Sequence, residues 1–409
     1  MAKEIVIVGT LDTKGAEYLF LKTCIEKTGF KTLVVDVGIK GDPLFRPDIT
    51  NEEVARAGGS SIKALVAKGD RGLAIDVMMK GAAAIVGKLY QEGRLAAVIS
   101  LGGTAGTTIG TYVMRSLPVG VPKLQVSTVA SGDTRPYVGA KDITMMYSVV
   151  DISGINIISR KIIANAAHAI VGMVSYETGE VGGQSEDKPL IAATMFGVTT
   201  PCVSKARAWL ESLGYEVLVF HATGTGGQSM EKLIEDGFIV GVLDITTTEW
   251  ADQLVGGVFS AGPARLEAAG AKGIPQVVSL GALDMVNFGP MDTVPERFKN
   301  RNLYKHNASV TLMRTTTSEN TCLGEIIASK LNAAKSPTAL FLPLKGVSMI
   351  DSPGKPFYGP EEDKALFSAI RANIDTRVVE VIEMDNEIND DAFALAMAEK
   401  LHAMLTAKK

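Results

Sequence analysis

Residues 4–15 have the sequence EIVIVGTLDTKG, in which an apolar run meets a loop of glycine, threonine, aspartate and lysine. The run predicts a buried strand, and the residues after it predict a helix over about 16–28, a stop at Gly29 and a second strand over about 32–37. Aliphatic strands separated by helices are typical of a parallel sheet that is covered on both faces. Ligands bind such sheets beyond the carboxyl ends of the strands, where this loop lies.

The same pattern returns in the second half of the chain. A shift of 185 residues aligns residues 5–37 with residues 190–222 without a gap, and later segments align at a shift of about 144 to 153. Because the shift becomes smaller, the first half must contain an extra segment, which lies near residues 40–94. This segment has a helical pattern. An internal duplication explains the likeness, and so does chance, because any two βαβ units look alike at this level.

These patterns predict an α/β protein of two Rossmann-like subdomains with mostly parallel sheets. A chain of 409 residues exceeds what one hydrophobic core usually supports. The boundary falls in the polar, glycine-rich stretch over residues 177–188, which precedes an apolar strand at Leu190. We expect an N-terminal subdomain over residues 1–182, with the helical insertion near 40–94, and a C-terminal subdomain over 188–409.

Composition and charge exclude several classes of partner. The formal net charge is -4 and no long basic run is present, so neither a nucleic acid nor an anionic membrane is an expected partner. Residues 95–114 carry no charge, but their glycines and threonines predict a strand, a loop and a buried helix rather than a membrane span. No secretion signal is visible at the N-terminus, and the three cysteines are widely separated. We therefore expect a soluble, cytoplasmic protein.

The loop over residues 9–15 has the features of an anion site. The first amides of the following helix have no intrahelical partner, and the helix dipole adds to their attraction for an anion. The Thr13 hydroxyl and the Lys14 ammonium complete a seat for a phosphate. Asp12 is a candidate ligand for Mg²⁺ on that phosphate, or it caps the helix without a further function. The loop matches neither of the common glycine-rich phosphate motifs.

A second loop, SLGGTAGTT over residues 100–108, gives the strongest local signal. Its adjacent glycines bring main-chain N–H groups close to an anion, and its threonines add hydroxyl donors. The alternative is a tight turn of small residues that only joins strand to helix. A third loop, over residues 127–134, also follows a predicted strand, and we expect all three loops to converge on one crevice. Arg71 is either a further phosphate contact or a solvated surface residue.

The second half carries the acid and base groups that a catalytic site requires. His221 follows a strand beside a glycine loop, with Asp244, Glu249 and Asp284 as possible partners. The alternative for His221 is a structural, hydrogen-bonded role. We expect His168 in the core, and His306 and His402 at the surface. No nucleophile elbow, kinase signature or EF-hand loop is present.

Six stretches of the chain resemble the family of the tomato mosaic virus resistance protein's ATP-binding inhibitory domain and its uncharacterised microbial relatives. The resemblance extends over essentially the whole chain. The stretches are residues 9–14, 127–132, 194–202, 220–224, 242–249 and 281–290.

The resemblance implies two Rossmann-like subdomains, ATP with Mg²⁺ in the N-terminal one, and a homodimer. Carried over position by position, it assigns the nucleotide contacts to Asp12, Thr13, Lys14, Ile39, Arg71, Gly103, Thr104, Ala105 and Gly106. Ile39 stands where the family has a hydroxyl residue, so a side-chain hydrogen bond is lost there. Binding of a viral protein is not carried over.

Three hypotheses of function follow. The first is an ATP-binding protein whose nucleotide regulates conformation or assembly. The second is an enzyme that acts on a small metabolite in the cleft between the lobes, with ATP as cosubstrate and His221, Asp244, Glu249 and Asp284 as candidate catalytic residues. The third is a protein-interaction module, which requires an exposed apolar patch around residues 73–90.

Overall fold

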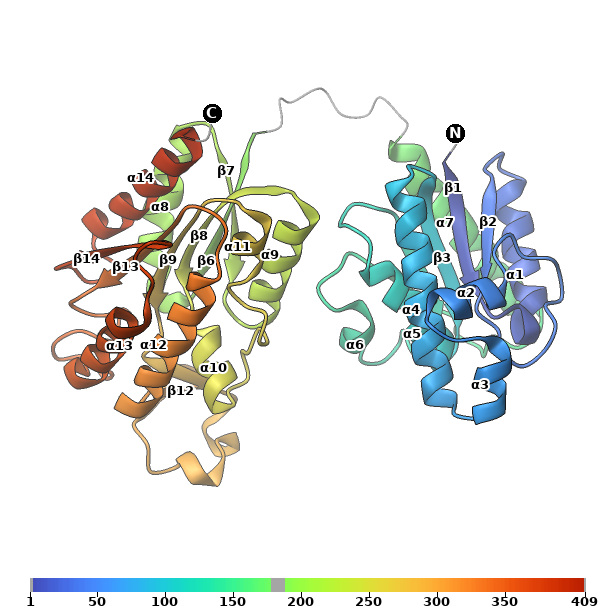
Figure 1. Ribbon diagram of the computed structural model, residues 1–409. Helices are drawn as coiled ribbons and strands as arrows, with labels where there is room; N and C mark the ends of the chain where they lie inside the picture. Colours follow the sequence, from blue (N-terminus) through green and yellow to red (C-terminus); the bar gives the residue numbers. More distant parts are fainter. Residues whose placement is uncertain (1–2, 178–187, 408–409) are drawn as a thin grey trace. The chain divides into compact units, whose positions relative to one another are not determined.

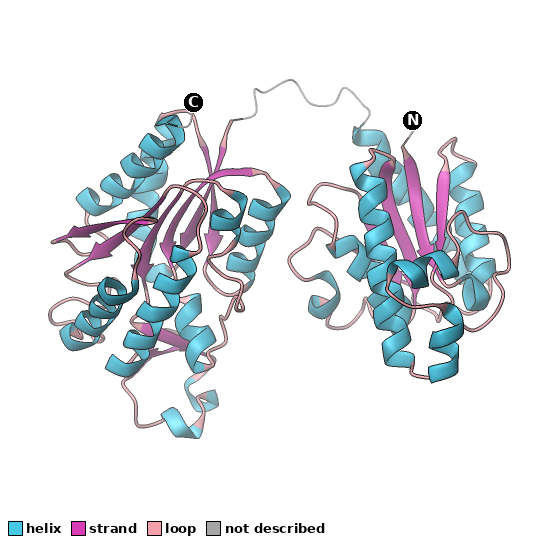
Figure 2. Ribbon diagram, in the orientation of Figure 1, coloured by secondary structure: helices cyan, strands magenta, loops and turns pink. Residues whose placement is uncertain are grey.

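The structure is a computed structural model of the chain, and it describes residues 3–177 and 188–407. The chain forms two compact units, Met1–Ser185 and Glu186–Lys409. Each unit is an α/β fold built on a parallel sheet with helices packed on it (Figures 1 and 2). The predicted fold class is confirmed. The predicted end of the first subdomain at residue 182 lies outside the described residues.

The first unit contains a five-stranded sheet in which all paired strands are parallel. The strand order is β2-β1-β3-β4-β5. The strands are β1 (Glu4–Gly9), β2 (Thr32–Asp36), β3 (Leu95–Gly102), β4 (Lys123–Ser127) and β5 (Thr144–Tyr147). The chain passes from β1 to β2 on one side of β1, and then crosses to β3 on the other side of β1. The boundary between β1 and β3 is therefore the switch point of the sheet.

Helices pack on both faces of this sheet. One face carries α1 and α7, and the other carries α2, α4 and α5. The helices are α1 (Leu11–Glu26), α2 (Asn51–Ala57), α3 (Ile62–Lys68), α4 (Arg71–Gln91), α5 (Thr104–Arg115), α6 (Arg135–Val138) and α7 (Ile157–Glu177). The first helix begins at Leu11, earlier than predicted, because loop residues form a first turn. This turn ends in a kink at Lys14, whose φ of -132° and ψ of 27° are not helical.

The connection between β2 and β3 contains α2, α3 and α4, in the region where an extra segment is expected. The corresponding connection of the second unit contains α9 alone. The apolar side chains of α4, among them Val77, Met78 and Val86, are buried in the core. They do not form the exposed patch that the third hypothesis requires, although Tyr90 at the end of the helix is 40% exposed.

The second unit contains a six-stranded parallel sheet in the order β14-β13-β9-β8-β6-β7, and a three-stranded antiparallel sheet in the order β10-β12-β11. Five strands of the larger sheet repeat the winding of the first unit, and β14 extends it. The strands are β6 (Leu190–Met195), β7 (Glu216–His221), β8 (Ile239–Thr246), β9 (Gln276–Gly281), β10 (Met285–Phe288), β11 (Leu303–Lys305), β12 (Thr311–Arg314), β13 (Thr338–Pro343) and β14 (Val379–Met384).

Helices again accompany the strands of the second unit. The α-helices are α8 (Thr200–Ser212), α9 (Thr225–Asp236), α10 (Glu249–Val255), α11 (Ala268–Lys272), α12 (Thr317–Asn332), α13 (Pro360–Asn373) and α14 (Asp391–Ala407). Three short 3₁₀ turns lie at η1 (Gly197–Thr199), η2 (Met291–Thr293) and η3 (Glu296–Phe298).

One described helix, α7, is long and apolar enough over Ile157–Ser175 to cross a membrane by length and composition alone. Its buried residues, including Ile163, Ala167 and Ile170, pack into the core beside β1 and α1, and a core helix passes the same test. The prediction that His168 is a core residue is wrong. His168 is exposed because it lies on the helix face opposite these buried positions. Of the two histidines predicted at the surface, His306 is exposed, and His402 is half-buried against Tyr215.

Candidate functional site

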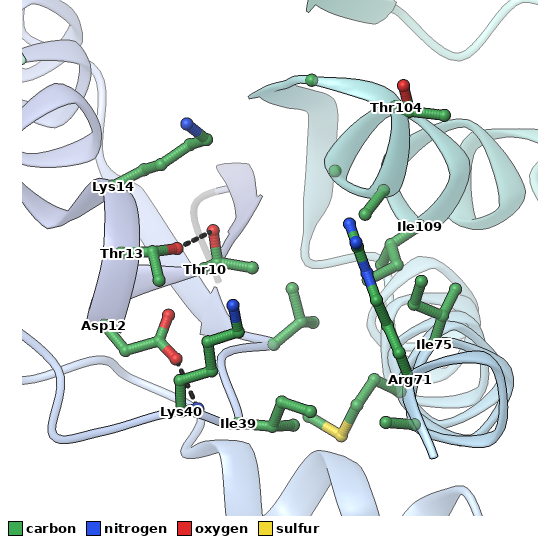
Figure 3. A pocket seen from close by; sticks show the side chains of 16 residues that line it. Thr10, Asp12, Thr13, Lys14, Ile39, Lys40, Arg71, Ile75, Thr104 and Ile109 are labelled. Carbon is green, nitrogen blue, oxygen red and sulfur yellow. Dashed lines mark hydrogen bonds between the residues drawn. The ribbon is translucent and has the colours of Figure 1, made fainter. Parts of the chain in front are cut away.

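A cavity of about 350 Å³ lies at the carboxyl ends of β1 and β3, the switch point of the first sheet (Figure 3). Its walls come from the loops after β1 and β2, from the first turns of α4, and from the start of α5. All nine residues predicted to contact a nucleotide line it, namely Asp12, Thr13, Lys14, Ile39, Arg71, Gly103, Thr104, Ala105 and Gly106. The fold therefore brings four separate segments of the sequence together at one place.

A buried carboxylate at the end of β2 holds the loops on this side of the cavity. Asp36 accepts hydrogen bonds from the backbone N–H of Leu11 at 3.1 Å and of Gly38 at 2.9 Å. Burial raises the pKa of Asp36, and the nearby carboxylate of Asp12 raises it further, while the two hydrogen bonds oppose this shift. Asp36 thus fixes the first turn of α1 against the end of β2, although it does not line the cavity.

The carboxylate of Asp12 lies against the backbone that follows β2. A Cβ atom on Gly38 would be 2.6 Å from the Asp12 carboxyl carbon, so only glycine fits there. Asp12 Oδ2 accepts a hydrogen bond from Lys40 N at 2.7 Å, so this carboxylate does not cap α1. Asp12 Oδ1 is buried and has no hydrogen-bond partner within the described residues. An unpartnered carboxylate oxygen of this kind is a suitable ligand for a hard cation.

Lys14 and Thr13 complete the first loop. The Thr13 hydroxyl donates to the Thr10 hydroxyl at 3.1 Å. The Lys14 side chain lines the cavity, and its ammonium donates a hydrogen bond to the carbonyl of Ile152, a residue outside the lining.

The second loop presents the N-terminus of α5 to the cavity. Its N-cap residue, Gly103, provides no side-chain cap, and the first helical backbone bond runs from Thr107 N to Gly103 O at 2.9 Å. The amides of Thr104, Ala105 and Gly106 therefore have no partner within the helix. A Cβ on Gly102 would be 2.7 Å from the Cα of Gly106, so glycine allows the strand and the helix to approach closely.

The charge around the cavity favours an anion. Lys14, Lys40 and Arg71 bring three cations to the lining, against the single carboxylate of Asp12. Arg71 has no ion pair with any carboxylate in the part of the chain that the structure describes. The wall formed by α4 and α5, beside Arg71 in Figure 3, is apolar and includes Ile75 and Ile109.

The sequence reasoning missed seven lining residues: Thr10, Val37, Lys40, Ala74, Ile75, Met78 and Ile109. Thr10 lies inside the predicted loop over residues 9–15 but was given no contact there, and Val37 and Lys40 lie close to the predicted contact Ile39. The residues of α4 follow Arg71 at helical spacing, which is a signal that could have identified them.

The third loop does not converge on this cavity, contrary to the prediction. None of residues 127–134 lines it. Ser127 is buried and shares a hydrogen bond of 2.7 Å with the Thr107 hydroxyl. The reason is strand order, because β4 lies one strand farther from the switch point than β3.

Two of the candidate catalytic residues bind a buried arginine of the second unit. Arg265 Nη2 donates to Asp244 at 2.7 Å, and Arg265 Nε donates to Glu249 at 2.7 Å. Glu249 also accepts from the backbone N–H of Gly224 and Gly227. Arg265 is 1% exposed, so this cluster is part of the interior. The geometry shows a structural ion network.

The other two candidates lie apart from this network. Asp284 accepts a hydrogen bond from the Ser348 hydroxyl at 2.7 Å, and burial raises the pKa of Asp284 to about 6. His221 is exposed, and its ring packs edge-on against Phe196 with a centroid distance of 5.5 Å. Among the described residues, His221 makes no side-chain hydrogen bond to any of the three acids, and no group of three or more His, Cys, Asp or Glu could hold a metal ion.

Comparison with known proteins gives one consistent result. Models of the two domains of the uncharacterised protein family UPF0261 match the chain, the N-terminal domain over residues 3–179 and the C-terminal domain over residues 188–405. A UPF0261 protein of Clostridium tetani is 62% identical over 99% of this chain and 100% of its own length. The ToMV resistance protein Tm-1 of Solanum lycopersicum is 47% identical over 80% of this chain and 44% of its own length.

A solved structure also aligns with the chain. It is a UDP-N-acetylglucosamine 2-epimerase from Rickettsia bellii, with 9% identity over 100% of this chain and 97% of that one. The TM-score of 0.25 is too low for the likeness to carry an argument.

Proposed function

Since this chain belongs to the uncharacterised protein family UPF0261, we propose from the site itself that the N-terminal unit binds ATP with Mg²⁺ at the β1–β3 switch point. The observation that carries the proposal is the convergence of three cations, free helix N-terminal amides and an apolar wall on one cavity. Its volume of about 350 Å³ falls within the range of small-ligand sites.

In this proposal the phosphates and the base of the nucleotide contact different parts of the lining. The phosphates bind Lys14, Arg71 and the amides of Thr104, Ala105 and Gly106, because helix N-termini and cations both favour negative charge. The base packs on the apolar wall near Ile39. The likeness to the tomato resistance protein family supports ATP as the nucleotide.

The metal part of the proposal concerns Asp12. Mg²⁺ in nucleotide sites is held by one or two carboxylates together with phosphate oxygens and water. Asp12 is the only carboxylate in the lining, and its Oδ1 has no partner among the described residues. When bound, the metal would neutralise phosphate charge next to this carboxylate.

The proposal is limited to binding. Asp244, Glu249 and Asp284 are engaged in buried hydrogen bonds, and among the described residues His221 makes no side-chain hydrogen bond to any of them, so no observation favours the metabolite-enzyme hypothesis. We further propose a cytoplasmic homodimer, as the family resemblance implies, with neither nucleic acid nor membrane as partner. Light scattering after size exclusion tests the dimer, whose mass would be twice 43.2 kDa.

The test is calorimetric titration of the full chain with ATP and Mg²⁺. We expect Lys14→Ala to weaken ATP binding about 10-fold or more, because a charge-assisted bond to phosphate is lost. Lys27→Ala is the matched control, since Lys27 is an exposed lysine of the same helix region outside the cavity. Absence of binding heat with the unaltered chain, together with an unchanged melting temperature at high ATP concentration, would refute the proposal.

A further inference from the structure

We infer that anion binding in the cavity loosens the segment of residues 148–156, because Lys14 is shared between the two. This inference rests on the proposed function and concerns its regulation. The segment joins β5 to α7 in the first unit and is separate in sequence from every residue that lines the cavity.

The segment is weakly held on its own. Of residues 148–156, only Ser148 and Ile152 are buried. Val149 is 60% exposed and has a φ of 62°, a left-handed conformation that is strained for a β-branched residue. Such a segment needs attachments from elsewhere in order to keep one conformation.

Ser148 N donates a hydrogen bond to Ser127 O, and the Ile152 side chain is buried in the core. Two side chains of α1 add further attachments. The ammonium of Lys14 donates to the carbonyl of Ile152. One turn further along, the buried carboxylate of Glu17 accepts a hydrogen bond of 2.6 Å from Gly154 N. Both side chains face the segment, although Lys14 itself lies at the kink of α1. Lys14 lines the cavity and Glu17 does not, so one attachment is accessible to a ligand and the other is not.

A phosphate in the cavity competes with Ile152 for the Lys14 ammonium. A neutral carbonyl is a weaker acceptor for an ammonium than an anionic oxygen is. Ile152 does not belong to the lining, so an ammonium that turns toward a ligand within the lining weakens its bond to this carbonyl. The segment then keeps the Glu17 bond, the bond from Ser148 N to Ser127 O and the buried Ile152 side chain, and the strain at Val149 favours opening.

The two events are coupled in both directions. If ligand binding opens the segment, a change that opens the segment must strengthen ligand binding by the same factor. This reciprocity allows a test with a variant outside the cavity.

The first measurement is hydrogen exchange of the full chain, with and without ATP and Mg²⁺, followed in peptides that cover residues 148–158. We expect exchange in this segment to become about fivefold faster or more when ATP is bound, while exchange near the cavity slows. Lys14→Ala should show the faster exchange without ATP, and Lys27→Ala should behave as the unaltered chain.

The second measurement is calorimetric titration of Glu17→Gln with ATP and Mg²⁺. This variant weakens the other attachment to α1, and we expect it to bind ATP about 2- to 5-fold more tightly than the unaltered chain. ATP binding with unchanged or slower exchange in residues 148–158 would overturn this inference and leave the proposed function intact. Absence of ATP binding, by contrast, would overturn both.

Discussion

At the scale of single residues, two carboxylates with similar sequence contexts have different roles. Asp12 follows β1 and Asp36 ends β2, and both lie at strand ends where ligand contacts are expected. Asp36 is 1% exposed and uses its carboxylate to hold backbone amides. Asp12 lines the cavity and keeps one oxygen without a partner among the described residues. Residue type and position alone do not separate a ligand contact from a residue that holds a loop.

The role of Asp12 is tested by Asp12→Asn. The amide can still accept the hydrogen bond from Lys40 N, so the loop should keep its conformation. A neutral amide is a poor replacement for a carboxylate ligand of Mg²⁺. We expect ATP affinity with Mg²⁺ to fall about 10-fold, and affinity in the presence of a chelator to change little. Calorimetric titration under both conditions measures this, and an unchanged effect of Mg²⁺ in the variant would contradict the assignment.

At the scale of elements, the sequence predicts where strands and helices lie along the chain better than it predicts which elements are neighbours in space. The apolar runs identified β1 to β4 of the first sheet but not β5, and glycine-bearing loops identified the ends of β1 and β3. Strand order is not encoded in such local patterns, so the third loop was expected in the cavity. The structure shows that the cavity is formed by the loops near the switch point and not by the third loop. Lys40 and the residues of α4 were missed because their place depends on how the long β2–β3 connection folds.

The junction of β3 and α5 gives a prediction at this scale. A methyl group added by Gly102→Ala would be 2.7 Å from the Cα of Gly106, which is backbone and cannot move aside without moving the helix. We expect the free energy of unfolding of the first unit to fall by about 1–3 kcal/mol, as for other overpacked sites. ATP binding should weaken as well, because the α5 amides are displaced. Urea denaturation and calorimetric titration measure the two effects.

Gly87→Ala is the matched control for this junction. Gly87 lies inside α4, and an added Cβ would meet no atom within 4 Å. Alanine is favoured over glycine inside a helix, so we expect stability to rise by about 0.5–1 kcal/mol with ATP affinity unchanged. If both substitutions had the same effect, the close contact between Gly102 and Gly106 would not be what positions α5.

At the scale of the whole molecule, the two units share one strand order around the switch point but differ in the side chains that gather there. The switch point of the second unit lies between β6 and β8, and the network of Arg265 with Asp244 and Glu249 is anchored at the end of β8. Side chains of the chain itself supply the charges there, whereas in the first unit the cations and the α5 amides line a cavity. The parallel sheet could be predicted from the sequence in both units, but the antiparallel sheet β10-β12-β11 was not predicted. The difference between the sites could not, because it depends on Arg265, which reaches the network from a distant loop.

Buried acids give the second unit a stability that depends on pH. Asp252 is fully buried in α10 and accepts hydrogen bonds from Phe259 N, Asn287 N and Asn287 Nδ2. Burial outweighs these bonds and raises the pKa of Asp252 to about 7. In the unfolded chain this carboxyl ionises near pH 4, so between about pH 4 and about pH 7 the folded state binds more protons than the unfolded state. The free energy of unfolding therefore decreases as the pH rises through this range.

Asp252→Asn isolates this contribution, because an amide is neutral throughout the range. Asn287 Oδ1 has no partner within the described residues, so a rotated Asn287 amide can accept from the new side chain. Between about pH 5 and about pH 8 the unaltered chain should lose on the order of 3 kcal/mol more stability than the variant does. Both tryptophans of the chain, Trp209 and Trp250, belong to the second unit, so tryptophan fluorescence during urea denaturation reports this unit selectively. Equal pH dependence of the two proteins would show that Asp252 is ionised in the folded state at the lower pH.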